Sequence, residues 1–286
     1  MDCHWQDKRL HEARPPKGTD MDLINKIYHG DCLELMTDID SASVDLILSD
    51  PSYLQSLSEL SPALDGKLID WNLLSDQFYR ILKPNGQVAL FCDLITSVVL
   101  INAFQNNFRF RFHWVWQKPN GNPVNNKQPL SEIELILVWC KKDAKTRDLT
   151  FNHKDISTPG DPYSRKSIHQ SKIRKQHGNY LTKNSSGQRF PRQVIQFPSK
   201  CNLTKQERLE AEPFPCYKPI NLCGHVIKAL SNPDNLILDP FSGSGSVAIT
   251  CHRLNRDFIA IEKDPEYYIE SMGRLERERC QITLPF

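Results

Sequence analysis

Two clusters of residues in this sequence have the types and spacing that chemistry requires, and the first is a glycine-rich stretch late in the chain, LILDPFSGSGSVAI at 236–249. An apolar run ends at Asp239, a turn containing Gly243 and Gly245 follows, and a helix-like run opens at Ser246. Glycine lets the backbone turn sharply and approach a ligand closely, and the N–H groups at the start of the next helix can donate hydrogen bonds. The pattern predicts a strand, a tight turn and a helix that together bind a nucleotide-like cofactor.

The second cluster is Asp50-Pro51-Ser52-Tyr53, which ends the apolar run SVDLILS. A carboxylate at a strand end can accept a hydrogen bond from an amine, and the carbonyl of Pro51 can accept a second. The aromatic ring of Tyr53 can stack on a flat ring. An Asp-Pro step alone more often marks an ordinary turn, so the functional interpretation depends on its combination with the glycine-rich turn.

The glycine spacing also satisfies the dinucleotide fingerprint, because Gly243-x-Gly245-x-x-Ala248 is followed by Glu262 at the end of the apolar run FIAIE. A nicotinamide or flavin enzyme is therefore the first hypothesis to weigh. A doubly wound sheet built forward from this strand needs several more strands than the chain encodes after it. We therefore expect the remaining strands to be encoded upstream, which argues against that hypothesis.

The upstream sequence supplies elements that could position both clusters. Strands are expected at KIYH, SVDLILS, QVALFCD, FRFHWVWQKPNG and IELILVWCKK, and helices at WNLLSDQFYRIL, at the apolar run 94–107 and after Lys218-Pro219. The 94–107 helix is expected to be buried. Alternation of strands and helices predicts an α/β fold with a mostly parallel, Rossmann-like sheet, helices on both faces and an antiparallel pair at the edge.

Residues 141–200 differ sharply from the rest of the chain in charge. They contain 14 Lys and Arg but four Asp and Glu, whereas the whole chain has a net charge of +2. Histidine, tyrosine, phenylalanine and amide side chains are interspersed among the cations, a mixture suited to phosphate and base contacts. A solvated basic loop is the simpler alternative, and we favour a nucleic-acid-binding insert.

Composition limits the class of protein. With 39% hydrophobic and 24% charged residues, the chain has no apolar run near the roughly 20 residues of a membrane span. Its nine cysteines are scattered and form no CxxC pair, which argues against zinc and favours reduced thiols in the cytoplasm. The polar stretch 1–22, broken by Pro15-Pro16, is expected to be a flexible arm without a secretory signal.

The order of these segments resembles the DNA amino-methyltransferases, specifically the permuted beta group, in which the catalytic motif precedes the S-adenosylmethionine motif. The similarity covers about residues 26–276 and rests on an ordered set of segments: HGDCLELM, SVDLILSDPSY, RILKPNGQVALFCD, HWVWQKPNG, IELILVWCKK and the long stretch from YKPINLCGHV to YYIESMGRL. The resemblance implies a circularly permuted methyltransferase fold. Its expected parts are a catalytic half at 23–140, a target-recognition insert at 141–215 and a cofactor-binding half at 216–286.

The resemblance also implies a role for each motif residue. Glu262 would bind the cofactor ribose, Asp31 would face the adenine amine and Lys218 would lie near the cofactor carboxylate. The methionine side of S-adenosylmethionine would be lined by Asp239, Phe241, Gly243 and Gly245. Asp50, Pro51, Ser52 and Tyr53 would form the motif that holds a base flipped out of double-stranded DNA. DNA contacts are expected from Arg165, Lys166, Lys172, Arg174 and Lys175.

Two departures from the family pattern bear on activity. The second proline of the usual D-P-P-Y motif is Ser52, and FPCYKP stands where the family has a pattern closer to HPTQKP. The acidic first residue, Asp50, resembles the adenine-modifying branch, so we expect N6-adenine methylation. The alternatives are N4-cytosine or RNA methylation, or a DNA-binding protein with a degenerate motif. The sequence leaves open the recognition site, a homodimer and a partner restriction endonuclease.

Overall fold

The computed structural model describes residues 23–51, 69–122, 126–127, 129–171, 176–200, 203, 214 and 217–282. The expected N-terminal arm at 1–22 lies outside the described residues.

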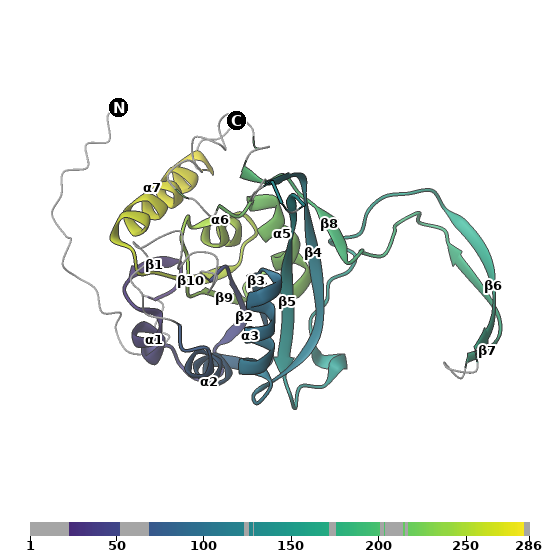
Figure 1. The fold of residues 1–286 in the computed structure, drawn as a ribbon, viewed down its shortest axis with the longest axis horizontal. Coiled ribbons are helices and arrows are strands. Elements are labelled where there is room, and N and C mark those ends of the chain that lie inside the picture. The colour runs from purple at the N-terminus through teal and green to yellow at the C-terminus, as the bar shows by residue number, and fades with distance from the viewer. Residues whose placement is uncertain are drawn as a thin grey trace.

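A single large sheet forms the centre of the described part of the chain, with eight strands in the order β1-β10-β9-β2-β3-β5-β4-β8 (Figure 1). Neighbouring strands pair in parallel except β5, which runs antiparallel to both β3 and β4. The strands are β1 (Lys26–His29), β2 (Val44–Ser49), β3 (Leu82–Cys92), β4 (Phe108–Asn122), β5 (Ser131–Lys141), β8 (Val194–Gln196), β9 (Leu236–Asp239) and β10 (Asp257–Glu262). The mostly parallel α/β fold and its antiparallel pair near the edge are therefore confirmed.

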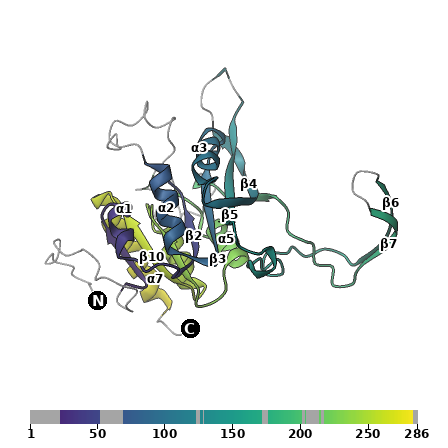
Figure 2. The same cartoon turned by 90° about the horizontal axis from the view of Figure 1, so that it is seen from below.

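Helices cover both faces of this sheet, as Figures 1 and 2 show. They are α1 (Cys32–Leu35), followed by the 3-10 turn η1 (Met36–Asp38), α2 (Trp71–Ile81), α3 (Leu94–Phe104), the 3-10 turn η2 (Thr146–Asp148), α5 (Ile220–Leu230), α6 (Ser246–Arg253) and α7 (Pro265–Ile282). Residues of α1, α2 and α3 share one buried cluster with Ile47 and Leu238. Residues of α5, α6 and α7 share another with Leu46 and Ile237. Adjacent strand residues thus face opposite layers, as the two-residue side-chain period requires.

Helix α2 illustrates how the sequence specifies an element. The Asp70 carboxylate accepts hydrogen bonds from the backbone N–H groups of Asn72 and Leu73 at 3.1 and 3.0 Å, which caps the helix. Leu74, Phe78 and Ile81 recur at helical spacing and are fully buried against the sheet. None of the helices in the described ranges is long and apolar enough to cross a membrane.

Two expected elements differ from the structure. The apolar run 94–107 predicts a buried helix, but in α3 Leu94 is 74% exposed, and Ile95 and Val98 are also exposed. That prediction is wrong for the outer face, because α3 is the outermost layer on its side of the sheet. Strand β3 begins at Leu82 rather than after the Lys-Pro-Asn-Gly turn, with irregular pairing between Leu82 and Gln87.

The basic segment contains a separate two-stranded sheet, β6 (Tyr163–Ser171) and β7 (Gln176–Asn184). The two strands pair antiparallel with each other and project away from the main body (Figures 1 and 2). The chain then returns at β8, which pairs with β4 at the edge of the large sheet. The projecting ribbon is thus attached through the strands at this edge.

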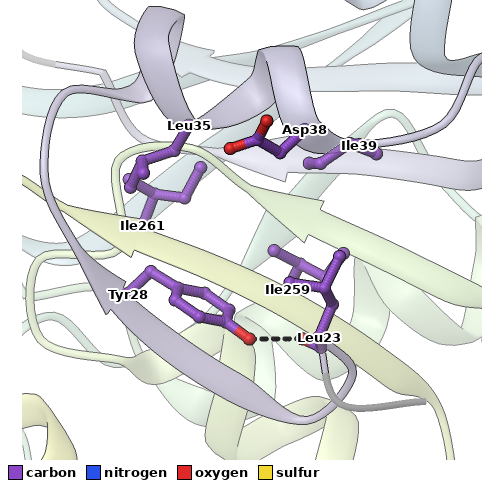
Figure 3. A pocket seen from close by; sticks show the side chains of 7 residues that line it. All are labelled: Leu23, Tyr28, Leu35, Asp38, Ile39, Ile259 and Ile261. Atoms are coloured by element: carbon purple, nitrogen blue, oxygen red, sulfur yellow. Dashed lines mark hydrogen bonds between the residues drawn. The ribbon is translucent and has the colours of Figure 1, made fainter. Parts of the chain in front are cut away.

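A small pocket lies between β1, β10 and the α1–η1 segment (Figure 3). Most of its lining is apolar, with Leu23, Leu35 and Ile261 among the lining residues. The Tyr28 hydroxyl donates a hydrogen bond to the Leu23 carbonyl at 3.2 Å within it. Its apolar lining makes this pocket part of the core packing.

Candidate functional site

Four parallel strands end at the same edge of the sheet, and each is followed by an acidic residue or ends on one. Strand β9 ends at Asp239, β10 ends at Glu262, β1 precedes Asp31 and β2 precedes Asp50. Helix α6, after β9, and helix α2, after β2, pack on opposite faces of the sheet. Such a reversal between neighbouring strands opens a crevice at their carboxyl ends, where α/β folds bind ligands. The expected cofactor and catalytic motifs therefore lie at the same edge of the sheet, after the paired strands β9 and β2.

The glycine-rich turn between β9 and α6 uses its two glycines differently. Gly243 has φ +48°, and a Cβ built on it would meet no atom within 4 Å. Gly245 has φ +71° at the N-cap of α6, where a Cβ would lie 3.2 Å from Cβ of Ser271. A side chain at Gly245 would meet the protein, whereas one at Gly243 would enter open space beside the turn.

Glu262 fixes the conformation of this turn. Its Oε2 accepts a hydrogen bond from the Gly243 N–H at 2.6 Å, and its Oε1 accepts one from the Asp264 N–H at 2.8 Å. Burial raises the pKa of the Glu262 carboxyl above its ordinary value, although both backbone hydrogen bonds oppose the shift. Asp31, one strand further along the edge, caps α1 through the Leu33 N–H at 2.9 Å.

Asp239 is a buried carboxyl at the seam between β9 and β2. The Ser49 hydroxyl at the end of β2 donates to Oδ1 of Asp239 at 2.5 Å, and the Phe241 N–H donates to the same oxygen at 3.3 Å. Burial raises the pKa of Asp239 to about 7, more than these hydrogen bonds lower it. The carboxyl therefore changes its protonation state near neutral pH.

Asp50 is paired with a lysine from a distant part of the chain. Nζ of Lys218 lies 2.6 Å from Oδ2 of Asp50 and 3.2 Å from Oε2 of Glu134, and Nζ of Lys118 lies 2.5 Å from Oε1 of Glu134. Lys218 also lies over the ring of Phe91, 5.3 Å from its centroid. The structure thus places Lys218 beside Asp50 of the expected catalytic motif, while its expected proximity to a cofactor carboxylate stays a prediction.

Three further residues, Lys118, Glu134 and Arg274, were not expected at the site from the sequence. Glu134 is an acid between the apolar residues Ile133 and Leu135 of β5, a signal that could have marked it. Arg274, on α7, is 4% exposed and donates to the Ser244 carbonyl in the glycine-rich turn. Its guanidinium carbon lies 5.2 Å from the ring centroid of Tyr217, next to Lys218. Arg274 therefore connects the glycine-rich turn with the segment that carries Lys218.

The remaining expected site residues are only partly described. Pro51 is buried directly after Asp50, whereas Ser52 and Tyr53 lie outside the described residues. Arg165 and Lys166 are exposed on β6. The other three expected DNA-contact residues, Lys172, Arg174 and Lys175, are outside the described part of the chain.

Comparison with known proteins adds a family and a fold. The model of a family described as DNA methylase, N6_N4_Mtase, matches residues 44–272. The Type II methyltransferase M.HinfI of Haemophilus influenzae is 26% identical, over 89% of this chain and 69% of the relative. The Type II methyltransferase M2.DpnII of Streptococcus pneumoniae is 25% identical, over 88% of this chain and 90% of the relative.

Two solved structures share the fold. The first, M1.HpyAVI in complex with SAM, has a TM-score of 0.57 and 23% identity, over 87% of this chain and 98% of the neighbour. The second, the cytosine-N4-specific PvuII DNA methyltransferase, has a TM-score of 0.60 and 17% identity, over 93% of this chain and 91% of the neighbour.

The raised pKa of Asp239 predicts an unusual dependence of stability on pH. Because its folded pKa of about 7 exceeds its ordinary value of 3.8, Asp239 stabilises the fold fully below pH 3.8, and this contribution is lost as pH rises to about 7. Asp239→Asn cannot ionise and keeps an acceptor oxygen for Ser49. We expect the variant to be more stable than the wild type at pH 8, by on the order of a few kcal/mol.

Urea unfolding midpoints measured at pH 5, 6.5 and 8 test this prediction. The matched control is Asp143→Asn, which replaces an exposed aspartate and should follow the wild-type curve. If the unfolding midpoints of Asp239→Asn and the wild type changed in parallel with pH, the predicted ionisation of Asp239 would be contradicted.

Proposed function

The chain belongs to the N6_N4_Mtase family of DNA methylases, and from this premise we propose that it transfers a methyl group from S-adenosylmethionine to the N6 amine of adenine in double-stranded DNA. The observation that carries the proposal is the position of the Asp50 carboxylate. It lies at the carboxyl end of β2, which pairs with β9, the strand that leads into the glycine-rich turn. The proposed acceptor for the amine and the proposed site for the methyl donor therefore follow paired strands.

The residues of the glycine-rich turn fit S-adenosylmethionine. The space beside Gly243 is open, and the carboxylates of Glu262 and Asp31 follow neighbouring strands, where they suit the hydroxyls and amine of a nucleoside. The structural neighbour M1.HpyAVI, crystallised with SAM, supports the same cofactor here. Bound S-adenosylmethionine supplies an electrophilic methyl carbon on its sulfonium, and loss of that methyl leaves a neutral thioether.

The chain's own residues would make the target amine reactive. The lone pair of an exocyclic amine is conjugated with its ring, so the nitrogen is a weak nucleophile. Hydrogen bonds from the amine to Asp50 and to the Pro51 carbonyl would draw the nitrogen toward a tetrahedral geometry and stabilise the charge that develops on it. The nitrogen then forms the new N–C bond and loses one proton to solvent. Alignment of the reacting atoms dominates the rate in this kind of displacement.

The target base must leave the duplex to reach Asp50, because its amine is otherwise hidden by base pairing. Tyr53 is proposed to stack on the flipped base. The projecting β6–β7 ribbon, with exposed Arg165 and Lys166, is proposed to contact the phosphates of the DNA duplex. The DNA substrate and the free, buried Cys92 and Cys140 support a cytoplasmic location.

Methylation of cytosine N4 is the second candidate, because the PvuII enzyme named above is cytosine-N4-specific. Asp50 as the first motif residue favours adenine. The two products differ in mass and in retention, so the same experiment separates them.

Nucleoside analysis tests the function. Unmethylated DNA treated with the protein and S-adenosylmethionine should yield N6-methyldeoxyadenosine on digestion and mass spectrometry. Asp50→Ala is the matched control and should lose at least about 100-fold in rate, because it removes the acceptor for the developing charge. N4-methyldeoxycytidine would contradict the adenine assignment, and no methylated nucleoside from the wild type would contradict the enzymatic function.

The cofactor site predicts a defect confined to binding. Gly243→Asn should bind S-adenosylmethionine at least about 10-fold more weakly, because its side chain would enter the open space beside the turn while asparagine tolerates a positive φ. Calorimetry gives the affinity, and the melting temperature should change little. Unchanged affinity in a folded Gly243→Asn protein would remove the glycine-rich turn from the cofactor site.

The basic residues between 165 and 175 are predicted to make a salt-dependent contribution to DNA affinity. Neutralising Arg165, Lys166, Lys172, Arg174 and Lys175 should weaken DNA binding and flatten the plot of log affinity against log salt, by roughly one unit for each phosphate that is no longer bound. Cofactor affinity should stay the same. Filter binding across a salt series measures both the affinity and the slope.

A control variant neutralises four exposed basic residues outside the 141–215 insert: Lys26, Lys228, Arg253 and Arg277. This variant should keep the wild-type slope. If the variant that lacks Arg165, Lys166, Lys172, Arg174 and Lys175 also keeps the wild-type affinity and slope, these cations only keep the surface soluble. The proposal of phosphate binding then fails.

A further inference from the structure

Four side chains of alternating charge form a continuous series of ion pairs at the carboxyl edge of the sheet, which we call the charge network: Lys118, Glu134, Lys218 and Asp50. Successive nitrogen–oxygen distances along it are 2.5, 3.2 and 2.6 Å. The four side chains are 11%, 14%, 8% and 16% exposed, in the same order. Solvent therefore screens these contacts much less than it screens a surface ion pair.

The charge network begins on two strands of the large sheet. Glu134 of β5 pairs with Trp116 of β4, and Lys118 directly follows Gln117, the last residue of β4 in regular pairing before an irregular stretch. Lys218 and Asp50, in contrast, stand outside regular elements, just before α5 and just after β2. Of the two members next to the proposed chemistry, Lys218 thus contacts Glu134 of the sheet directly, and Asp50 is connected to Glu134 through Lys218.

The charges of the four side chains balance. Burial favours the neutral form of Glu134, but the ammonium groups of Lys218 and Lys118 outweigh it and hold the pKa of that carboxyl below its ordinary value. Glu134 is therefore an anion, and two cations alternate with two anions. Removing one member of a buried set leaves a neighbouring charge uncompensated, which is more costly than removing a surface ion pair.

Glu134 is a second carboxylate partner of the Lys218 ammonium group, in addition to Asp50. A lysine side chain has many rotamers, and its ammonium group has three donors that can serve several acceptors. With Glu134 at 3.2 Å and Asp50 at 2.6 Å, the ammonium group is shared between two carboxylates. Without Glu134, the whole attraction of Lys218 would fall on Asp50 and compete with the target amine for that carboxylate.

We propose that Glu134 and Lys118 are positioning residues for methyl transfer, because Lys118 holds Glu134, Glu134 holds Lys218, and Lys218 sets the orientation of the Asp50 carboxylate. The inference rests on the proposed function and assigns roles to two residues that never touch the substrate. Small displacements of a reacting group lower the rate strongly. Loss of Glu134 should therefore lower kcat and leave binding of cofactor and DNA intact.

Three variants test whether Lys118 and Glu134 act in series through Lys218: Glu134→Gln, Lys118→Met and the double variant. Under single-turnover conditions with saturating cofactor and DNA, Glu134→Gln should be about 30–100-fold slower than the wild type and Lys118→Met about 10-fold slower. Because both act through Lys218, and because the double variant restores the charge balance, it should be no slower than Glu134→Gln alone. Dissociation constants for cofactor and DNA should stay within about threefold of the wild type.

Lys83→Met is the matched control. Lys83 forms an ion pair with Asp45 at 2.7 Å near the amino end of β2, away from Asp50. Its loss removes an ion pair of similar length that is more exposed to solvent, and should leave the single-turnover rate within about twofold of the wild type.

Lysine NMR provides a readout that does not depend on activity. The ammonium group of Lys218, assigned by its absence in Lys218→Met, should give a slowly exchanging Nζ signal in the protein without DNA or cofactor. That signal should move or broaden in Glu134→Gln and stay unchanged in Lys83→Met. An unchanged signal in Glu134→Gln would show that Glu134 does not hold Lys218.

The kinetic outcomes separate this inference from the proposed function. Wild-type rates in Glu134→Gln, or losses in the single variants that multiply in the double variant, would overturn the positioning role in an active enzyme. A loss of cofactor or DNA affinity in parallel with the rate would also overturn it, because the residues would then be generally structural. If the wild type transfers no methyl group, the proposed function fails. The NMR comparison still decides whether Glu134 holds Lys218 in the charge network.

Discussion

The hydrogen bond from the Ser49 hydroxyl to Asp239 joins two strand ends that are 190 residues apart in the sequence, and the geometry of the site depends on this seam. Strand β2 leads to Asp50, and β9 leads to the glycine-rich turn. Their pairing through Leu46 with Ile237 and Ile47 with Leu238 sets the strand ends level. A slip of one residue would turn each strand's side chains to the opposite layer and separate the two motifs. Alignment of β2 with β9 is therefore the constraint under which the proposed methyl-donor site and Asp50, the proposed acceptor for the target amine, can lie together.

Lys218 makes the late and the early parts of the chain electrostatically dependent on each other. It precedes α5 in the late part of the chain, yet its ammonium group contacts Asp50 and Glu134 from the early part. Tyr217 beside it lies against Arg274, which in turn binds the glycine-rich turn through the Ser244 carbonyl. A displacement of the turn would thus be transmitted through two neighbouring residues to the carboxylate proposed to accept the target amine.

Short-range patterns predicted most of the fold. Apolar strand runs such as VDLILS, the helical spacing of Leu74, Phe78 and Ile81, and the glycines after Asp239 each specify a local conformation, and the structure has these elements where the sequence places them. The exposed outer face of α3 was missed, because an apolar run reveals which residues could be buried but not whether a partner covers them. The contacts of Lys118, Glu134 and Arg274 were missed for a related reason. Long-range ion pairs depend on which strands become neighbours, and charged side chains carry no periodic signal of their partners.

The β6–β7 ribbon has a consequence for how this chain can diversify. Its nine residue pairs lie in a sheet separate from the eight-stranded one, so its backbone hydrogen bonds are satisfied without help from the main sheet. Substitutions or changes of length there should alter the free energy of folding of the main sheet little. Selection can then reshape this extension while the four strand ends stay fixed. In a lineage built on this plan, the ribbon proposed to contact DNA can change far faster than the strand ends proposed to carry the reaction.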